Sequence, residues 1–182
     1  MDQRYCIPEM FETARYRLRR ANPSDALAIF ESYATDPTVT RYIGWRPHSE
    51  PCDTEDFLEE ASAEWETGKG FPSVVFPQSE PDHLIGMFHP HVFGHKVTYG
   101  YVLAKKAWGN GCATEVMTWL VDHALEHPAI YRAEAFCDIE NRGSARVMEK
   151  AGMIREGLLR RFFIHPNISE APRDCLMYAK VK

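Results

Sequence analysis

The sequence lacks three features that would each mark a distinct class of protein. It has no apolar run near the ~18 residues that a membrane-spanning helix requires, and it has no internal repeat or low-complexity tract. Its net charge is −5, whereas a nucleic-acid-binding domain usually carries a basic surplus. These absences predict a protein that binds neither a membrane nor nucleic acid.

Cysteine is scarce and irregularly spaced. The five cysteines are odd in number and no two of them form a CxxC pair, which argues against a disulfide framework or a zinc site. The opening stretch MDQRYCIPEMFETARYRLRR is too charged for a signal peptide. We therefore expect reduced thiols, no metal and a cytoplasmic location.

What the sequence does contain is typical of one globular domain. Its 182 residues are 45% hydrophobic and 26% charged, enough to bury a core in one domain and too few for two comfortable ones. We expect a single domain over residues 1–182, with residues 1–13 as an N-terminal extension.

Hydrophobic periodicity predicts an alternation of strands and helices. Alternating or apolar runs indicate seven strands, near residues 15–19, 71–76, 83–89, 96–103, 131–137, 155–164 and 175–181. Four helical segments lie between them, with predicted caps at Asn22, at Asp53 or Thr54, at the glycine turn that precedes residue 112, and at Asn141. The order predicts a mixed α/β (α+β) sheet.

The stretch KKAWGNGCATEV, residues 105–116, places Gly109 and Gly111 just before a predicted helix. Because a helix N-terminus offers unpaired amides and partial positive charge, such a turn is suited to phosphate. A turn without a ligand is one interpretation. A dinucleotide-binding GxGxxG turn is another, with Asp138 as the ribose-binding acid, but Thr114 replaces the third glycine and more than half of the chain comes first. The third is a turn that binds the pyrophosphate of coenzyme A.

Two segments together carry a resemblance to a known family. YGYVLAKKAWGNGCATEV and CDIENRGSARVMEKAGM resemble the coenzyme A loop and the following strand and helix of the GNAT acetyltransferase superfamily, in its RimJ/RimL-like branch. The resemblance extends over residues 15–182. It implies a GNAT fold, in which a mostly antiparallel sheet of about seven strands with four helices splays between strand four (96–103) and strand five (131–137). It also implies an acetyl-CoA-dependent N-acetyltransferase.

The resemblance assigns residues to the cofactor. Strand four would pair with the pantetheine arm, and an amide near Val102 or Leu103 would polarise the thioester oxygen. Trp108 stands where most of the family has Arg or Gln, as is usual in this branch. The full set of implied cofactor contacts is Tyr101, Val102, Leu103, Trp108, Gly109, Asn110, Gly111, Cys112, Ala113, Thr114, Asn141 and Ser144.

The catalytic groups are implied less directly. Met148 occupies the position of the tyrosine acid found in many members, so Ser144 is the candidate acid, although it also suits a first-turn serine. Glu134 is a candidate base or an exposed structural carboxylate, and His89, His91 and Tyr99 are other candidate bases. A cysteine at a helix N-terminus, such as Cys112, tends to ionise more easily. A covalent acyl-cysteine route would need a base beside it, and the sequence shows none, so direct transfer is the simpler interpretation.

The acceptor is expected to be a primary amine, either a protein N-terminus or a small molecule. The segment TRYIGWRPH would line its site through Tyr42, Trp45 and Arg46, with Tyr99 as a further contact. A monomer or a homodimer is compatible with this interpretation. Two other functions stay open, a coenzyme A-binding module with little catalysis and, more distantly, a dinucleotide-dependent oxidoreductase.

Overall fold

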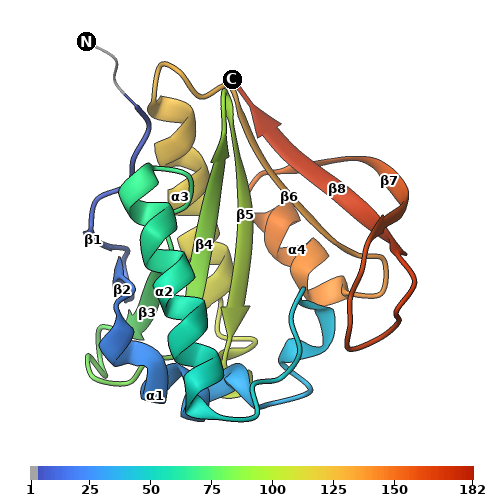
Figure 1. The fold of residues 1–182 in the computed structure, drawn as a ribbon. Helices are drawn as coiled ribbons and strands as arrows, with labels where there is room; N and C mark the ends of the chain where they lie inside the picture. The colour runs from blue at the N-terminus through green and yellow to red at the C-terminus, as the bar shows by residue number, and fades with distance from the viewer. Residues whose placement is uncertain (1–3) are drawn as a thin grey trace.

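The computed structural model describes residues 4–182 and contains one eight-stranded sheet in the order β1-β2-β3-β4-β5-β6-β8-β7 (Figure 1). The sheet has one strand more than predicted. The additional strand is β1 (Met10–Glu12), which pairs antiparallel with β2 (Tyr16–Arg20). It lies within the predicted extension 1–13, of which residues 1–3 fall outside the described part. Backbone pairing thus makes part of that segment an edge of the sheet.

The remaining elements agree with the predicted order. The other strands are β3 (Ser73–Pro77), β4 (Gly86–Phe93), β5 (Lys96–Leu103), β6 (Arg132–Asp138), β7 (Ile154–Phe163) and β8 (Arg173–Val181). The helices are α1 (Ala26–Ile29), α2 (Pro51–Thr67), α3 (Cys112–Glu126) and α4 (Arg142–Lys150). Within residues 4–182, no helix is long and apolar enough to cross a membrane.

The sheet opens between its two central strands. β5 and β6 are parallel and pair at only three positions, the last being Thr98 with Glu134, whereas every other neighbouring pair is antiparallel. On its other edge β5 stays paired with β4 as far as Leu103. From residue 99 onward β5 and β6 therefore diverge, which confirms the predicted mixed sheet and its splay.

The helices cover the two faces of the sheet with separate cores. The apolar stripe of α3 is completely buried in one core, together with Tyr99 of β5; its members are Val116, Met117, Leu120, Val121 and Ala124. The other core joins α1 and α2 to alternate strand residues such as Met87 and Val74. Because side chains alternate along a strand, β5 sends neighbouring residues to opposite cores.

Two helix predictions need correction. The sequence places Leu27 on one helical face with Phe30 and Ala34. In the structure the inward face is that of Ala26 and Ile29, continued by Tyr33 in the π-helical turn over Phe30–Ala34, and Leu27 on the neighbouring face is exposed. α2 begins at Pro51, earlier than predicted. Asp53 accepts hydrogen bonds from the amides of Ser49 and Glu50 and so caps the helix from its third position.

Candidate active site

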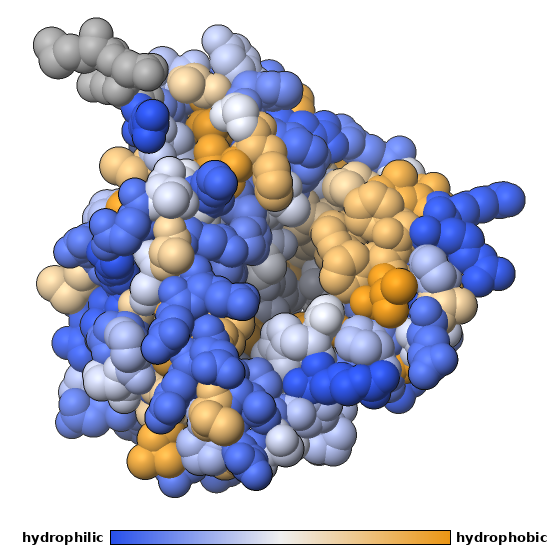
Figure 2. All heavy atoms as spheres, in the orientation of Figure 1, coloured by the Kyte–Doolittle hydropathy of each residue, from blue (hydrophilic) through white to orange (hydrophobic). Residues whose placement is uncertain are grey.

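A cleft of about 1040 Å³ opens where β5 and β6 part. Figure 2 shows this face of the molecule hollowed between α2 and the β6–β8 side, and the wall on the β6–β8 side is largely apolar. Residues from α2, β4, β5, the start of α3, α4 and the segment after β7 line it. The separation of β5 and β6 thus creates a cleft that is lined by residues from both halves of the chain.

Most of the predicted site residues meet in this cleft. Those that line it are Tyr42, Trp45, Tyr99, Tyr101, Val102, Leu103, Trp108, Gly109, Gly111, Cys112, Ala113, Thr114, Asn141 and Ser144. Three predicted residues, Arg46, Asn110 and Glu134, lie outside it.

The glycine turn has a conformation that requires glycine. Gly109 and Gly111 have φ of 78° and 81°, in the left-handed region that other residues rarely adopt. α3 begins directly after Gly111, so the first amides of this 15-residue helix have no partner inside the helix. The turn therefore presents uncovered backbone and the positive end of a helix to the cleft.

The connection between β1 and β2 forms hydrogen bonds to this turn and to the start of α3. Arg15 Nε donates to Glu115 Oε2 over 2.8 Å, and Arg15 Nη1 donates to the carbonyl of Asn110 over 3.0 Å. Thr13 Oγ1 and the Arg15 amide both donate to Glu115 Oε1, over 2.7 Å and 2.8 Å. Asn110 accordingly turns its carbonyl toward Arg15, and the residue lies outside the cleft. These bonds between distant residues hold the turn in place before any ligand arrives.

Cys112 does not have the reactivity expected of a cysteine at a helix N-terminus. Its side chain is buried, and that burial raises the pKa of the thiol to about 12. The neighbouring carboxylate of Glu115 raises the pKa further, against a smaller effect of Arg15. The thiol stays protonated near neutral pH, so Cys112 contributes its backbone to the turn and not a nucleophile.

Two hydroxyl groups meet across the splay. Tyr101 of β5 donates its hydroxyl proton to Ser144 Oγ of α4 over 3.0 Å, and burial raises the pKa of Tyr101 to about 12. The Ser144 amide donates to Asn141 Oδ1 over 3.1 Å, so Asn141 caps α4. Because the cap uses the amide of Ser144, its hydroxyl proton remains free for another partner.

Glu134 is placed as a structural carboxylate. Oε1 accepts from Lys96 Nζ over 2.6 Å and Oε2 accepts from Arg132 Nε over 2.5 Å, and the buried side chain also accepts from Thr98. Burial by itself would raise the pKa of Glu134, but the bonds from Lys96 and Arg132 outweigh it and lower the pKa. A carboxylate stabilised in its charged form by two cations is a poor base.

The segment predicted to bind the acceptor lines the cleft only in part. Tyr42 and Trp45 line the cleft, whereas Arg46 lies outside it. Asn167 Nδ2 donates to the carbonyls of Thr40 and Trp45 over 2.7 Å each, which ties this segment to the loop after β7. Packing between segments more than 120 residues apart thus decides which side chains face inward.

Tyr99 lines the cleft, but its hydroxyl group points into the core. That hydroxyl donates to the carbonyl of Leu120 over 3.0 Å inside the core, and burial raises its pKa. Tyr99 stays a predicted substrate contact because it lines the cleft, whereas a role as a base does not fit its buried, hydrogen-bonded hydroxyl.

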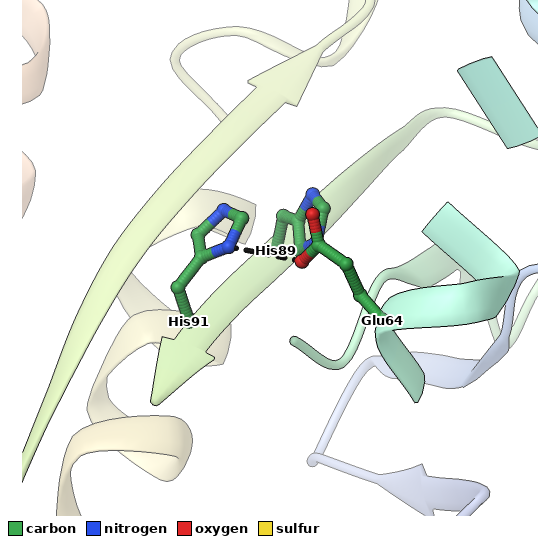
Figure 3. Close-up of side chains that lie close together, drawn as sticks. All are labelled: Glu64, His89 and His91. Carbon is green, nitrogen blue, oxygen red and sulfur yellow. Dashed lines mark hydrogen bonds and ion pairs between the residues drawn. The ribbon is translucent and has the colours of Figure 1, made fainter. Parts of the chain in front are cut away.

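Two groups of cleft residues were missed or left undecided by sequence reasoning. Arg142, Arg146 and Lys150 line the cleft from α4, and their spacing of four residues was a detectable signal of one helical face. Glu64 of α2 lies beside His89 and His91 of β4 (Figure 3). Glu64 carried no signal, because the pairing joins positions 25 residues apart.

Comparison with known proteins agrees with this geometry. Residues 15–154 match the family model described as Acetyltransferase (GNAT) domain, and the chain belongs to this family of acyltransferases. The N-acetyltransferase YnaD of Bacillus subtilis (strain 168), whose activity is uncharacterised, is 31% identical over 153 residues, which span 82% of this chain and 85% of YnaD. YoaA of the same organism, also named an uncharacterised N-acetyltransferase, is 27% identical over 176 residues, 95% of this chain and 97% of YoaA.

Solved structures give the same fold. A GNAT-family acetyltransferase from Bacillus anthracis superposes with a TM-score of 0.79 at 27% identity, covering 94% of this chain and 98% of its own. RimL, a ribosomal L7/L12 alpha-N-protein acetyltransferase solved in complex with coenzyme A, has a TM-score of 0.81 at 18% identity, covering 95% and 98%. The fold of this chain is therefore that of GNAT acetyltransferases, RimL among them.

Proposed function

We propose that the protein is an acetyl-CoA-dependent N-acetyltransferase in which a primary amine attacks the thioester directly. One observation supports this proposal above the others. The edge of β5 that separates from β6 and the glycine turn at the N-terminus of α3, with its positive φ angles, line the same cleft of a GNAT fold. The coenzyme A bound to RimL, which shares this fold, supports the choice of cofactor. The acceptor is either a peptide N-terminus or a small amine.

The cofactor would lie along the diverging edge of β5. Residues 101–103 would pair with its pantetheine arm as an additional strand, and an amide near Val102 or Leu103 would donate to the thioester oxygen. The pyrophosphate would sit on the amides of the turn from Gly109 to Thr114, with Trp108 packed alongside. Trp108 Nε1 donates to the Leu103 carbonyl over 2.8 Å, which links the strand end to the turn.

We assign Ser144 as the acid that protonates the departing thiolate. Its Oγ accepts a hydrogen bond from the Tyr101 hydroxyl, so its own proton is available to another acceptor, and both residues line the cleft. As the C–S bond breaks, Ser144 would give its proton to the sulfur and recover one from Tyr101. A thiolate is a good leaving group, so this assistance needs to be only modest.

The direct test measures the release of free thiol from acetyl-CoA across a panel of amines. The panel contains peptides beginning with Ala, Ser or Met, free amino acids, polyamines and aminoglycosides. We expect turnover with one class, which identifies the acceptor. Acetyl-CoA binding without turnover on every member would favour the binding-module alternative.

A thermal-shift panel separates the cofactor alternatives. A ligand that binds only the folded state raises its stability, by about 2.7 kcal/mol at a hundredfold excess over Kd. Acetyl-CoA and coenzyme A should raise the melting temperature, and NAD(H) and NADP(H) should not. The reverse pattern would favour the dinucleotide-dependent oxidoreductase.

A further inference from the structure

Glu64, His89 and His91 form a cluster on the wall of the cleft, and Figure 3 shows the three side chains converging. Glu64 Oε2 lies 3.0 Å from His89 Nε2 and 3.1 Å from His91 Nδ1. A carboxylate only accepts hydrogen bonds, so His89 Nε2 donates to it. The negative charge of Glu64 favours the proton of His91 on Nδ1, the ring nitrogen that faces the carboxylate. In the neutral imidazoles the lone pairs then belong to the opposite nitrogens, His89 Nδ1 and His91 Nε2.

The absence of a side chain at Gly70 leaves the space that the Glu64 carboxylate occupies. Gly70 follows α2 and forms an isolated bridge with His91. A Cβ at residue 70 would lie 2.0 Å from Glu64 Oε2 and 2.9 Å from His89 Nε2, so a larger residue would displace the carboxylate. The two imidazole rings stack with their centroids 3.9 Å apart. Glycine, stacking and the shared carboxylate together hold both rings in one orientation.

The cluster stands beside the point where the sheet opens. His91 pairs with Thr98 and His89 pairs with Gly100, and Thr98 is the last residue of β5 to pair with β6. Residues directly opposite in an antiparallel pair point to the same face, so the imidazoles and Gly100 share a face of the sheet. Gly100 carries no side chain, which leaves the surface next to His89 clear toward the open edge of β5.

We propose that His91 is the proton acceptor for the attacking amine and that Glu64 is the positioning residue that orients it, an inference that rests on the proposed function. His91 is the more open of the two rings, with 33% of its side chain exposed against 16% for His89. Burial and the neighbouring His91 lower the pKa of His89 to about 4, so His89 stays neutral and supports its partner by stacking.

Protons and electron pairs balance across the transfer. The acceptor enters as an ammonium, one of its N–H bonds breaks, and that proton bonds to His91 Nε2. The freed lone pair forms the N–C bond to the acetyl carbon, and the C–S bond breaks. The nitrogen then releases a second proton to solvent, while the thiolate receives one from Ser144, which regains a proton from solvent through Tyr101.

The products are the amide, the thiol and an imidazolium paired with Glu64 through His91 Nδ1. This assigns the base role that the ion-paired Glu134 does not fit.

The first test compares two histidine variants. His91→Ala should lower kcat about a hundredfold or more, the size of a lost general base, while the Kd for acetyl-CoA stays within about twofold. Added imidazole should restore part of the turnover in this variant and leave the wild type unchanged. The matched control is His83→Ala, because His83 forms a similar 3.0 Å pair with Glu80 but is exposed and outside the cleft; it should behave as the wild type.

The second test addresses positioning. Glu64→Gln should lower kcat about tenfold with the KM for the amine within about twofold, since orientation and not binding is lost. Glu66→Gln, two residues along the same helix and paired with the distant Arg20, is the control and should have no effect on kcat. Gly70→Ala should reproduce the Glu64→Gln loss, because its Cβ occupies the place of the carboxylate.

Three results would overturn the assignment. A His91→Ala variant that binds acetyl-CoA and keeps kcat within about threefold of the wild type would exclude His91 while leaving the proposed function intact. Turnover that is abolished by EDTA and restored by Zn²⁺ would make the cluster a metal site instead. Wild-type protein that binds acetyl-CoA but acetylates no amine would overturn the proposed function, and with it this inference.

Discussion

At the residue scale, Gly111 tests whether the turn binds phosphate. Gly111→Val should weaken acetyl-CoA binding at least about tenfold, because a side chain there meets both the left-handed φ of 81° and Arg15 Nη2 at 3.0 Å from the added Cβ. Binding is measured by calorimetry. Gly94→Val is the matched control, since Gly94 also has a positive φ, of 61°, but lies in the β4–β5 turn away from the cleft. Equal affinity in the two variants would refute the phosphate assignment.

A substitution of Ser144 can distinguish an effect on catalysis from an effect on cofactor binding. Ser144→Ala should lower kcat about tenfold, below the usual range for an acid–base group because thiolate is a good leaving group, with little change in the Kd for acetyl-CoA. The cap on α4 should survive, because Asn141 accepts from the backbone amide and not from the hydroxyl. Tyr101→Phe should give a smaller loss in the same direction. Equal losses of kcat and affinity in Ser144→Ala would identify a structural serine.

At the element scale, α4 presents a basic face to the cleft. Arg142, Arg146 and Lys150 recur every fourth residue and line the cleft, so they would face the phosphates of a bound coenzyme A. Arg146→Gln should weaken acetyl-CoA binding several-fold, about 1 kcal/mol for an exposed charge, and the difference should shrink at high salt. Arg155→Gln removes the same charge from β7, outside the cleft, and should leave the affinity unchanged.

At the scale of the whole molecule, Asp138 joins the last hairpin to the central sheet. Its buried carboxylate accepts from Arg173 Nε over 2.6 Å, and His165 lies 3.8 Å away. Asp138→Asn should lower the free energy of unfolding by about 3 kcal/mol, because it leaves Arg173 without its buried partner. Asp122→Asn, which breaks the exposed pair with Lys180, should cost less than about 1 kcal/mol. Urea denaturation measures both, and equal losses would contradict the buried-pair argument.

The same carboxylate predicts how stability depends on pH. Burial by itself would raise the pKa of Asp138, but the bonds from Arg173 and the Glu140 amide outweigh it and the pKa is lowered. The pair's contribution is therefore complete above about pH 4, the usual value in an unfolded chain, and is lost as the pH falls toward the lower folded value. Urea midpoints between about pH 7 and about pH 3 should show a shallower decline in Asp138→Asn than in the wild type. Parallel declines would place the acid-sensitive group elsewhere.

Much of the fold was predictable because its signals are local. The alternation in residues 96–103 lies within one segment of chain, as does the glycine turn with the helix that follows it. The structure contains this strand, turn and helix as predicted. The short edge strand β1 was missed, because three residues carry too little alternation to be recognised. The inward face of α1 was misassigned, because Ala26, Ile29 and Tyr33 point into the core and Leu27 lies on the neighbouring face.

The sequence by itself determined the order of strands and helices and the glycine turn, since these depend on patterns within short segments. Two of those segments also carried the resemblance that implied the family and its splayed sheet. Only the tertiary structure decided which side chains share the cleft. Glu64 meets His89 across 25 residues, Asp138 meets Arg173 across 35, and Arg15 meets Glu115 across 100. Whether such pairs form depends on strand order and helix placement. For this reason the glutamate at position 134 forms an ion pair with Lys96, whereas the glutamate at position 64 lies beside the imidazole of His91.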